Sequence, residues 1–292
     1  MHIPVLLKEI LEHLSPKPGQ NFIDATVGNG GHMAAILEKI APNGKLLAID
    51  RDPMSLTAAK FKVQSSKFKN NVIFVNSSFG DLQEIVSKEH FESIKGILFD
   101  FGMSSEQLEN SGKGFSFQKD EIMDMRFDPR TPMTAEDIVN GYSEKELAEI
   151  FEKFGEESRA WSIARAIAES RRRKRIKTTL ELTGIIEKVK RRFGRIHPAT
   201  QIFQALRIEV NQELVEIERA LAVLPEILAK GSRAAFISFH SLEDRIVKNW
   251  SRDFNKKNII KNLTKKPIAS SAEEVRVNPR SRSAKLRVIE KI

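Results

Sequence analysis

Short apolar runs alternate with helical patterns over the first hundred residues. The runs predict strands at 22–25, 45–50, 72–75 and 96–100, and helical periodicity fills the intervals 31–40, 53–67 and 80–90. This alternation is typical of βαβ units that surround a buried parallel sheet. The sequence therefore predicts an α/β fold.

The pattern changes near residue 104. No period is recognisable over 106–132, and the chain then becomes helical. Two helices begin with capping boxes, in which a Ser or Thr and a Glu three residues later satisfy each other's backbone N–H groups. These pairs are Ser143 with Glu146 and Thr178 with Glu181.

The C-terminal part returns to the strand–helix pattern. Its predicted elements are a helix over 199–223 that breaks near Pro225, a strand over 233–239, a helix over 241–254 capped by Ser241, a polar surface loop over 262–284 and a strand over 285–292. A sheet that begins, stops and resumes indicates one α/β domain with an inserted helical domain. We place the discontinuous α/β domain at 1–105 and 198–292 and the insertion at 106–197.

The stretch FIDATVGNGGH (22–32) combines a strand end with three glycines. Gly28, Gly30 and Gly31 permit positive φ and close ligand approach, and the next helix offers unpaired N–H groups. Asp50 ends the second strand about twenty residues later, where a carboxylate can bind both ribose hydroxyls. This arrangement predicts a nucleotide ligand, and a purely structural turn is the alternative.

Two ligand classes compete for this loop. A dinucleotide such as NAD requires the spacing G-x-G-x-x-G, whereas the order here is G-x-G-G. Asp24 at the strand end would repel a pyrophosphate but attract the ammonium and sulfonium groups of S-adenosyl-L-methionine. Asp24 therefore favours S-adenosylmethionine, although a carboxylate that only accepts loop N–H groups would give the same sequence.

A third acid, Asp100, ends the fourth strand. We therefore expect Asp24, Asp50 and Asp100 on the carboxyl edge of the sheet, where open parallel sheets bind ligands. Gln107 can donate and accept hydrogen bonds, which suits an adenine or another base edge. His240, directly after a later strand, is either a substrate contact at this edge or a histidine satisfied beside a helix cap.

Polar residues in and after the insertion are further candidates for substrate contacts. Arg126 follows Asp124 by two positions and forms either a buried ion pair or a phosphate contact. Gln204, Arg207 and Asn211 recur at intervals of three and four, so they share one helix face. A polar face on such an apolar helix should meet either a wet cleft or a polar network.

Charge narrows the choice of partner. The 292 residues carry a formal net charge of +9, and the positive residues form four clusters. The clusters lie at 171–175, which includes Arg171, Arg172 and Arg173, and at 190–195, 256–266 and 280–287. One cluster alone would be a solvated helix face, but four favour a nucleic acid.

Other compositional features exclude several classes. The chain has no cysteine, so disulfides, thiolate catalysis and zinc–thiolate sites are excluded. No apolar run reaches the length of a membrane span, and the start MHIPVLLKEILEHL resembles an amphipathic helix rather than a signal peptide. We expect a cytoplasmic protein without a membrane partner, and no ligand spacing indicates a metal.

Several sequence blocks together resemble the MraW family of bacterial 16S rRNA cytosine-N4 methyltransferases. These blocks are HIPVLL (2–7), DATVGNGGH (24–32), AIDRDP (48–53), DFGMSSEQL (100–108), KGFSF (113–117), MDMR (123–126), FGEESRAWSIARAI (154–167), HPATQIFQALRIEVNQEL (197–214), ISFHSLEDRIVK (237–248) and NPRSRSAKLR (278–287). The resemblance implies a class I, Rossmann-like methyltransferase domain with an inserted all-helical substrate-recognition domain. It also implies S-adenosylmethionine as cofactor, with contacts at Gly30, Gly31, His32, Asp50, Phe79, Asp100 and Gln107.

The resemblance implies a substrate as well: a cytosine in the decoding region of 16S rRNA within the small ribosomal subunit. The amine of cytosine is a weak nucleophile because its lone pair is delocalised into the ring. The Asp/Asn-Pro-Pro-aromatic turn of many amine methyltransferases is absent, and DFGMSS (100–105) takes its place. We hypothesise that Asp100 positions the cofactor and accepts a hydrogen bond from the target amine.

Three other functions remain open at the level of sequence. They are a ribosome assembly factor without activity, a small-molecule methyltransferase and a dinucleotide oxidoreductase. The basic clusters disfavour the second, and Asp24 with the missing third glycine disfavours the last. A dimer is compatible with the sequence but is not derivable from it.

Overall fold

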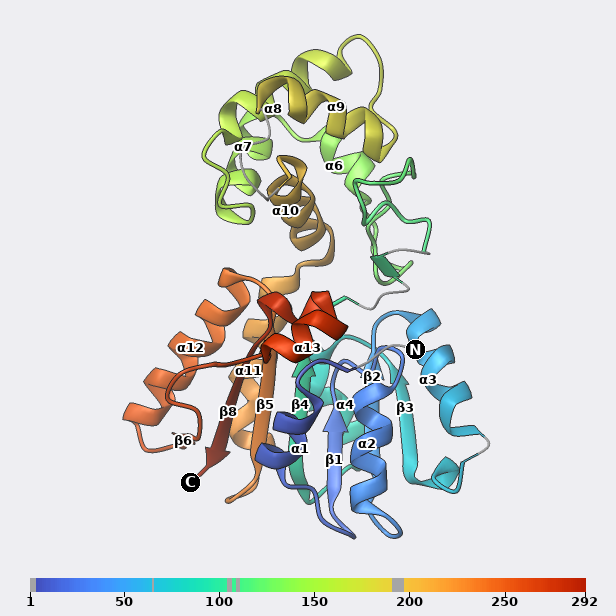
Figure 1. Cartoon of the computed structure of the whole chain (residues 1–292), viewed down its shortest axis with the longest axis vertical. Helices are drawn as coiled ribbons and strands as arrows, with labels where there is room; N and C mark the ends of the chain where they lie inside the picture. The colour runs from blue at the N-terminus through green and yellow to red at the C-terminus, as the bar shows by residue number, and fades with distance from the viewer. Residues whose placement is uncertain (1–3, 65, 104–106, 109–110, 191–196) are drawn as a thin grey trace. The chain divides into compact units, whose positions relative to one another are not determined.

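A computed structural model describes residues 4–64, 66–103, 107–108, 111–190 and 197–292. The chain forms two compact units (Figure 1). Unit 1 comprises Met1–Gly102 and Leu214–Ile292, and unit 2 comprises Met103–Glu213. Among the helices of the described residues, none combines the length and apolar character that crossing a membrane needs.

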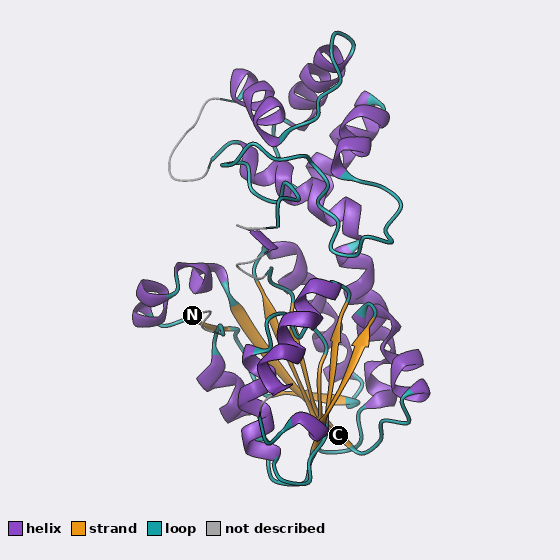
Figure 2. Ribbon diagram, turned by 90° about the vertical axis from the view of Figure 1, so that its right-hand side faces the viewer, coloured by secondary structure: helices purple, strands orange, loops and turns teal. Residues whose placement is uncertain are grey.

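Unit 1 contains a sheet with helices on both faces (Figures 1 and 2). Its strands are β1 (Asn21–Asp24), β2 (Leu46–Asp50), β3 (Val72–Asn76), β4 (Ile94–Asp100), β5 (Arg233–Ser238), β6 (Ile260–Asn262), β7 (Ile268–Ala269) and β8 (Lys285–Lys291). Within the described residues the order is β3-β2-β1-β4-β5-β8-β6, and β7 also pairs with β8. β1 to β5 are parallel, and β8 is antiparallel to its neighbours. The predicted α/β fold is confirmed.

Two apolar layers enclose this sheet. The helices of unit 1 are α1 (Leu7–Leu14), α2 (Gly31–Ile40), α3 (Pro53–Gln64), α4 (Leu82–Lys88), α11 (Glu213–Ile227), α12 (Ser241–Lys256) and α13 (Ala272–Val277), with short 3-10 turns η1 (Lys69–Asn71), η2 (Phe79–Asp81) and η3 (Pro279–Ser283). Helices α1, α2 and α3 pack on one face and α4, α11 and α12 on the other. Successive strand residues serve opposite layers, as Phe22 and Ile23 do in β1. Strands buried on both faces explain the continuous apolar runs in the sequence.

Unit 2 is helical and has its own core. It contains α6 (Ala135–Gly141), α7 (Glu144–Lys153), α8 (Ala160–Arg171), α9 (Thr179–Val189) and α10 (Ala199–Asn211). Their buried faces form one apolar cluster with loop residues such as Phe115 and Phe127. Both predicted capping boxes are present, at the starts of α7 and α9.

The insertion ends later than the 197/198 boundary that the sequence suggested. Helix α10 belongs to unit 2 because Ile202, Phe203 and Leu206 are buried in the core that α6 to α9 share. The units are therefore divided at residues 213 and 214.

The single helix expected over 199–223 is in fact two helices. The chain turns at Gln212, which has a left-handed φ of 51°. Pro225, the expected break, lies inside α11 near its C-terminal end. A proline there removes one hydrogen bond close to a terminus, so the helix continues past it.

The segment 262–284 is not the simple surface loop that we expected. It contains β7, α13 and η3. Ser271 caps α13 by accepting from the N–H of Glu274, whose carboxylate in turn accepts from the N–H of Leu6 at 2.7 Å. Elements of two and six residues are too short to produce a recognisable period, which explains why the pattern missed them.

Candidate active site

Three carboxylates end three adjacent strands of unit 1. Asp24, Asp50 and Asp100 are the last residues of β1, β2 and β4, and β1 lies between the other two. The register pairs Asp24 with Ala48 of β2 and with Leu98 of β4. The expected acidic edge at the carboxyl ends of the strands is therefore confirmed as geometry.

The glycine loop between β1 and α2 is held by packing as well as by turn geometry. Gly28 and Gly30 have positive φ of 50° and 71°. A Cβ on Gly30 would lie 2.7 Å from Met33 Cε and 3.3 Å from Ala59 Cβ, and one on Gly31 would lie 2.5 Å from Pro4 Cγ. A side chain at Gly30 or Gly31 would therefore collide with neighbouring residues, so these two glycines also serve packing within the protein.

Asp50 fixes this loop to the end of β2. Its Oδ2 accepts from the N–H of Gly28 at 2.8 Å, and its Oδ1 accepts from the N–H of Asp52 at 2.9 Å. Burial raises the pKa of Asp50 to about 6, although both backbone hydrogen bonds act to lower it. Each carboxylate oxygen keeps a second lone pair, so Asp50 can also accept from ribose hydroxyls.

Asp24 is the most deeply buried of the three acids, with 1% of its surface exposed. Its Oδ1 accepts from the N–H of Thr26 at 3.3 Å, whereas Oδ2 has no hydrogen-bond partner in the described part of the chain. Burial raises the pKa of Asp24 to about 7, and the nearby imidazole of His32 acts to lower it. A buried carboxylate oxygen without a partner suits a cationic ligand group.

His32 and Asp100 face each other at the start of α2 and the end of β4. The distance from His32 Nε2 to Asp100 Oδ2 is 3.5 Å, and His32 is buried. Two hydrogen bonds fix Asp100. Its backbone N–H donates to Thr26 Oγ1 at 2.7 Å, and its Oδ1 accepts from the N–H of Gly102 at 3.2 Å. Thr26 was not identified from the sequence, because its partner is 74 residues away.

Phe79 lies just beyond the end of β3, in the turn η2. Its ring centroid is 5.9 Å from that of Phe99 and 5.8 Å from that of Phe101. β3 pairs with β2, and Asn76 donates to the carbonyl oxygen of Asp50 at 3.0 Å. Phe79 and Asp50 therefore lie beyond and at the ends of two neighbouring strands, β3 and β2.

Two carboxylates and one arginine clamp the Phe79 turn. Ser78 donates to the carboxylate of Glu216 and accepts from the N–H of Gly80. Arg219 bridges Glu216 at 3.0 Å and Asp81 at 2.6 Å. Both ends of η2 are therefore attached to α11.

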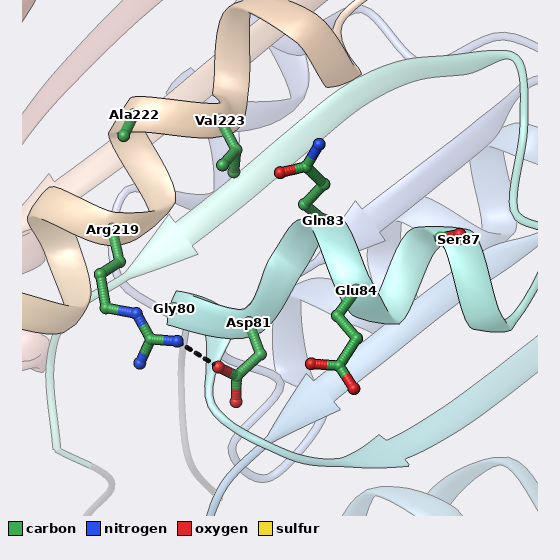
Figure 3. A pocket seen from close by; sticks show the side chains of 8 residues that line it. All are labelled: Gly80, Asp81, Gln83, Glu84, Ser87, Arg219, Ala222 and Val223. Carbon is green, nitrogen blue, oxygen red and sulfur yellow. Dashed lines mark hydrogen bonds and ion pairs between the residues drawn. The ribbon is translucent and has the colours of Figure 1, made fainter.

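Figure 3 shows the outer side of this clamp. Arg219 and Asp81 meet at the rim of a hollow of about 630 Å³, formed between α4 and α11. Gly80 lies at the same rim, and a Cβ there would collide with the carboxylate of Glu216. No local sequence pattern predicts this clamp, since Ser78 and Glu216 are 138 positions apart.

His240 is the residue before α12, and a buried carboxylate lies close to its ring. Its Nε2 lies 2.9 Å from Oε1 of the buried Glu243. Glu243 also accepts from the N–H groups of Phe239 and His240, so His240 rather than Ser241 is the N-cap. Both ring nitrogens of His240 are buried without a hydrogen-bond partner in the described part of the chain, so both alternatives for His240, a substrate contact and a residue beside a cap, stay open.

Each nitrogen of the Arg126 guanidinium, in unit 2, donates a hydrogen bond within this unit. The guanidinium donates to both carboxylate oxygens of Asp124, at 2.9 and 2.8 Å, and to the carbonyl oxygens of Pro129 and Thr131. The ion-pair alternative for Arg126 therefore matches the structure.

The polar face of α10 meets a network within unit 2. Gln204 donates to the carbonyl oxygen of Phe154 at 2.9 Å, and Arg207 forms a two-pronged ion pair with Glu213 at 2.8 and 2.9 Å. Asn211 donates to Met125 O at 2.7 Å and accepts from the N–H of Phe127 at 2.9 Å. This face stabilises the loop and the helix ends of unit 2.

The other predicted site residues of unit 2 differ in their exposure and in their hydrogen bonds within the unit. Arg171 donates to the carbonyl oxygen of Val139 at 2.6 Å, whereas Arg172 and Arg173 are exposed. Gln107 is half-buried in unit 2, and its carbonyl oxygen accepts from Ser111 at 2.6 Å. Most of the cluster at 190–195 lies outside the described residues.

Comparison with known proteins matches the whole chain, residues 1–292, to the MraW methylase family. The chain is 45% identical to "Ribosomal RNA small subunit methyltransferase H" of Dehalococcoides mccartyi, covering 100% of this chain and 86% of that protein. It is 47% identical to proteins of the same name from Sulfurihydrogenibium sp., covering 98% of both chains, and Persephonella marina, covering 100% and 99%.

A solved structure supports the fold alone. The crystal structure of a candidate rRNA methylase from Clostridium thermocellum aligns over 100% of both chains, with a TM-score of 0.50 and 12% sequence identity. The buried, unpartnered Asp24 Oδ2 and the loop at the start of α2 fit the ammonium and carboxylate ends of S-adenosylmethionine. The chain belongs to the MraW methylase family and is a methyltransferase that uses S-adenosylmethionine as its cofactor.

Proposed function

We propose that this methyltransferase modifies the exocyclic N4 of a cytosine in the decoding region of 16S rRNA. The substrate class is supported by full-length relatives named for methylation of small-subunit ribosomal RNA, at 45 to 47% identity. The net charge of +9 is consistent with a polyanionic substrate. The single observation that carries the chemistry is the row of Asp24, Asp50 and Asp100 along the carboxyl edge of the sheet.

Each part of this edge has a proposed role in holding the cofactor. Asp50 binds the ribose hydroxyls, and Phe79 packs against the adenine. Asp24 faces the cationic amino-acid portion, with the backbone of Gly30 and Gly31 beside it. Asp24 and Asp50 both have raised pKa values, which fits carboxylates that are kept for a ligand rather than for internal ion pairs.

The reaction itself needs alignment more than charge stabilisation. When bound, S-adenosylmethionine supplies an electrophilic methyl carbon on a sulfonium. Asp100, next to His32, is placed to accept a hydrogen bond from the target amine, which returns electron density to the nitrogen. Correct alignment of nucleophile and methyl group is worth roughly 7–11 kcal/mol in favourable cases.

Unit 2 is the proposed substrate-recognition domain. Its exposed Arg172 and Arg173 are candidates for phosphate contacts, since neither is buried. Arg126, Arg171, Gln204, Arg207 and Asn211 act instead through the internal contacts described above. The target cytosine has to leave its base stack before its amine can reach the methyl group.

The decisive experiment supplies labelled S-adenosylmethionine and unmodified small ribosomal subunits to the purified protein. We expect label in 16S rRNA and N4-methylcytidine after nucleoside mass spectrometry. Label in another nucleoside would contradict the proposed target atom. Cofactor binding without any transfer to rRNA would indicate another substrate, and failure to bind the cofactor would favour a non-enzymatic assembly factor.

A further inference from the structure

Helix α3 exposes an apolar stripe that the fold does not use. Its buried residues are Ser55, Leu56, Ala59 and Val63. On the opposite side, Met54 and Phe61 are 72% and 77% exposed and lie seven positions apart, two turns along one face. An exposed phenylalanine on a helix whose other face is already packed adds nothing to the core, which points to a role outside the fold.

Four exposed lysines lie on α3 or within five residues of its end. Lys60, Lys62, Lys67 and Lys69 are all exposed, and no acidic residue occurs between positions 53 and 71. None of the four forms an ion pair with a described residue. Three of the ammonium groups have other contacts: Lys60 lies 5.7 Å from the ring centroid of Phe74, Lys67 lies 5.3 Å from that of Phe68, and Lys62 donates to the carbonyl oxygen of Asn29 at 3.3 Å.

The basic run of unit 2 provides a contrast. There Lys174 pairs with Glu181 at 2.6 Å and Arg175 pairs with Glu136 at 2.7 Å. Those charges are neutralised inside their own unit, whereas the charges on α3 are not. Lys60 and Lys62 of α3, with Lys67 and Lys69 just after it, are therefore available to an external polyanion without first giving up a carboxylate partner.

The same helix contacts the glycine loop of the cofactor site. Ala59 of α3 packs against Gly30, where an added Cβ would lie 3.3 Å away, and Lys62 reaches the neighbouring Asn29. Through Lys62 this surface reaches the loop that is proposed to hold the methyl donor.

We propose that the α3 surface, formed by Met54, Lys60, Phe61, Lys62, Lys67 and Lys69, is a second rRNA-binding surface on the methyltransferase unit. The lysines bind backbone phosphates, and Phe61 stacks on an unpaired base. Aromatic rings among lysines are typical of single-stranded nucleic-acid binding. A second copy of this chain fits poorly, because two such patches would repel each other. The inference rests on the proposed rRNA substrate.

The test compares two quadruple variants with equal loss of charge. The first replaces Lys60, Lys62, Lys67 and Lys69 with Ala. The control replaces Lys88, Lys95, Lys230 and Lys248, which are exposed elsewhere on unit 1. We measure binding of small subunits at several salt concentrations, the KM for subunits, the Kd for S-adenosylmethionine and the melting temperature.

We expect the α3 variant alone to lose RNA affinity. Four lost contacts to single-stranded RNA would reduce the slope of log K against log salt by about 3. The melting temperature should remain that of the wild type, and the Kd for S-adenosylmethionine shows whether the loss of the Lys62 contact with Asn29 O also affects the cofactor site. In a separate pair, Phe61→Ala should raise the Kd for RNA by about tenfold, and Phe61→Tyr should restore it.

The outcomes separate this inference from the proposed function. If wild type and α3 variant bind and methylate subunits equally, the inference is wrong and the proposed function stands. If the control variant loses as much affinity as the α3 variant, the effect is one of net charge and the inference is also wrong. If the wild type neither binds nor methylates subunits, both proposals fail.

Discussion

The imidazole Nε2 of His32 lies 3.5 Å from Oδ2 of Asp100, and this contact joins the first turn of α2 to the end of β4. The carboxylate is held from behind by the N–H of Gly102, so its orientation does not depend on a ligand. A preset acceptor beside a buried imidazole is the arrangement that a hydrogen bond to a substrate amine needs.

We predict that Asp100→Asn lowers turnover at saturating cofactor by about 10²-fold, at the lower end of the range for a lost acid–base or acceptor group. The amide can still accept from Gly102, so the fold should persist, but it accepts only weakly from the amine. The measurement is single-turnover methylation with cofactor well above its Kd. Turnover near that of the wild type would mean that Asp100 only holds the cofactor. The control is Asp253→Asn, at an exposed position of α12.

We predict that the ionised carboxylate of Asp24 lowers the free energy of unfolding, although it serves ligand binding. The folded protein holds this proton up to a pKa of about 7, whereas the unfolded chain releases it near 3.8. The folded state therefore binds more protons between these values, and its stability falls as pH rises through that window. At pH 8 the cost is up to about 4 kcal/mol in the free energy of unfolding.

Asp24→Asn should consequently be more stable than the wild type at pH 8 and similar to it near pH 4. Urea unfolding without cofactor, at pH values between these limits, measures the difference. A variant that is less stable at pH 8 would show that the buried charge is compensated in the wild type. The same variant should bind S-adenosylmethionine at least tenfold more weakly, which a purely structural role would not require.

Which features of the fold and the site can be predicted from the sequence depends on how far apart along the chain the interacting residues lie. The acids at strand ends and the capping boxes of α7 and α9 are encoded within a few residues, so pattern alone located them. The contacts of the α10 face were left between two alternatives, because the partners of Gln204 and Asn211, Phe154 and Met125, lie 50 and 86 residues away. The turn at Gln212 could not be predicted, because no glycine or proline lies at that position or beside it.

Cofactor affinity should rise with pH. The cationic groups of the ligand prefer the ionised form of Asp24, and ribose hydroxyls donate more strongly to the ionised form of Asp50. Their pKa values are about 7 and 6 in the free protein. Protons compete with the ligand below these values, by up to tenfold per pH unit for each group. Calorimetry between pH 5.5 and 8.5 should therefore show two steps, and Asp24→Asn should retain only the lower one. A flat profile would mean that neither carboxylate faces the ligand.

The clamp on the Phe79 turn gives the last prediction. Glu216 holds Ser78, while Arg219 ties Glu216 to Asp81. Glu216→Ala frees the Ser78 end of η2 and leaves Arg219 with Asp81 alone, so the ring of Phe79 should lose its fixed position beside Phe99. We expect the Kd for S-adenosylmethionine to rise by about tenfold, equivalent to about 1.4 kcal/mol, with turnover at saturating cofactor little changed.

Two companion variants decide whether this effect is local. Glu218→Ala removes an exposed carboxylate from the same helix and should leave the Kd unchanged. Gly80→Ala should reproduce the weakened binding, because its Cβ would displace the Glu216 carboxylate while leaving every charge in place. If Glu216→Ala lowers the melting temperature without altering the Kd at a temperature where it is folded, the clamp stabilises unit 1 but does not position Phe79. If Gly80→Ala binds like the wild type, the turn tolerates displacement and the ring needs no clamp.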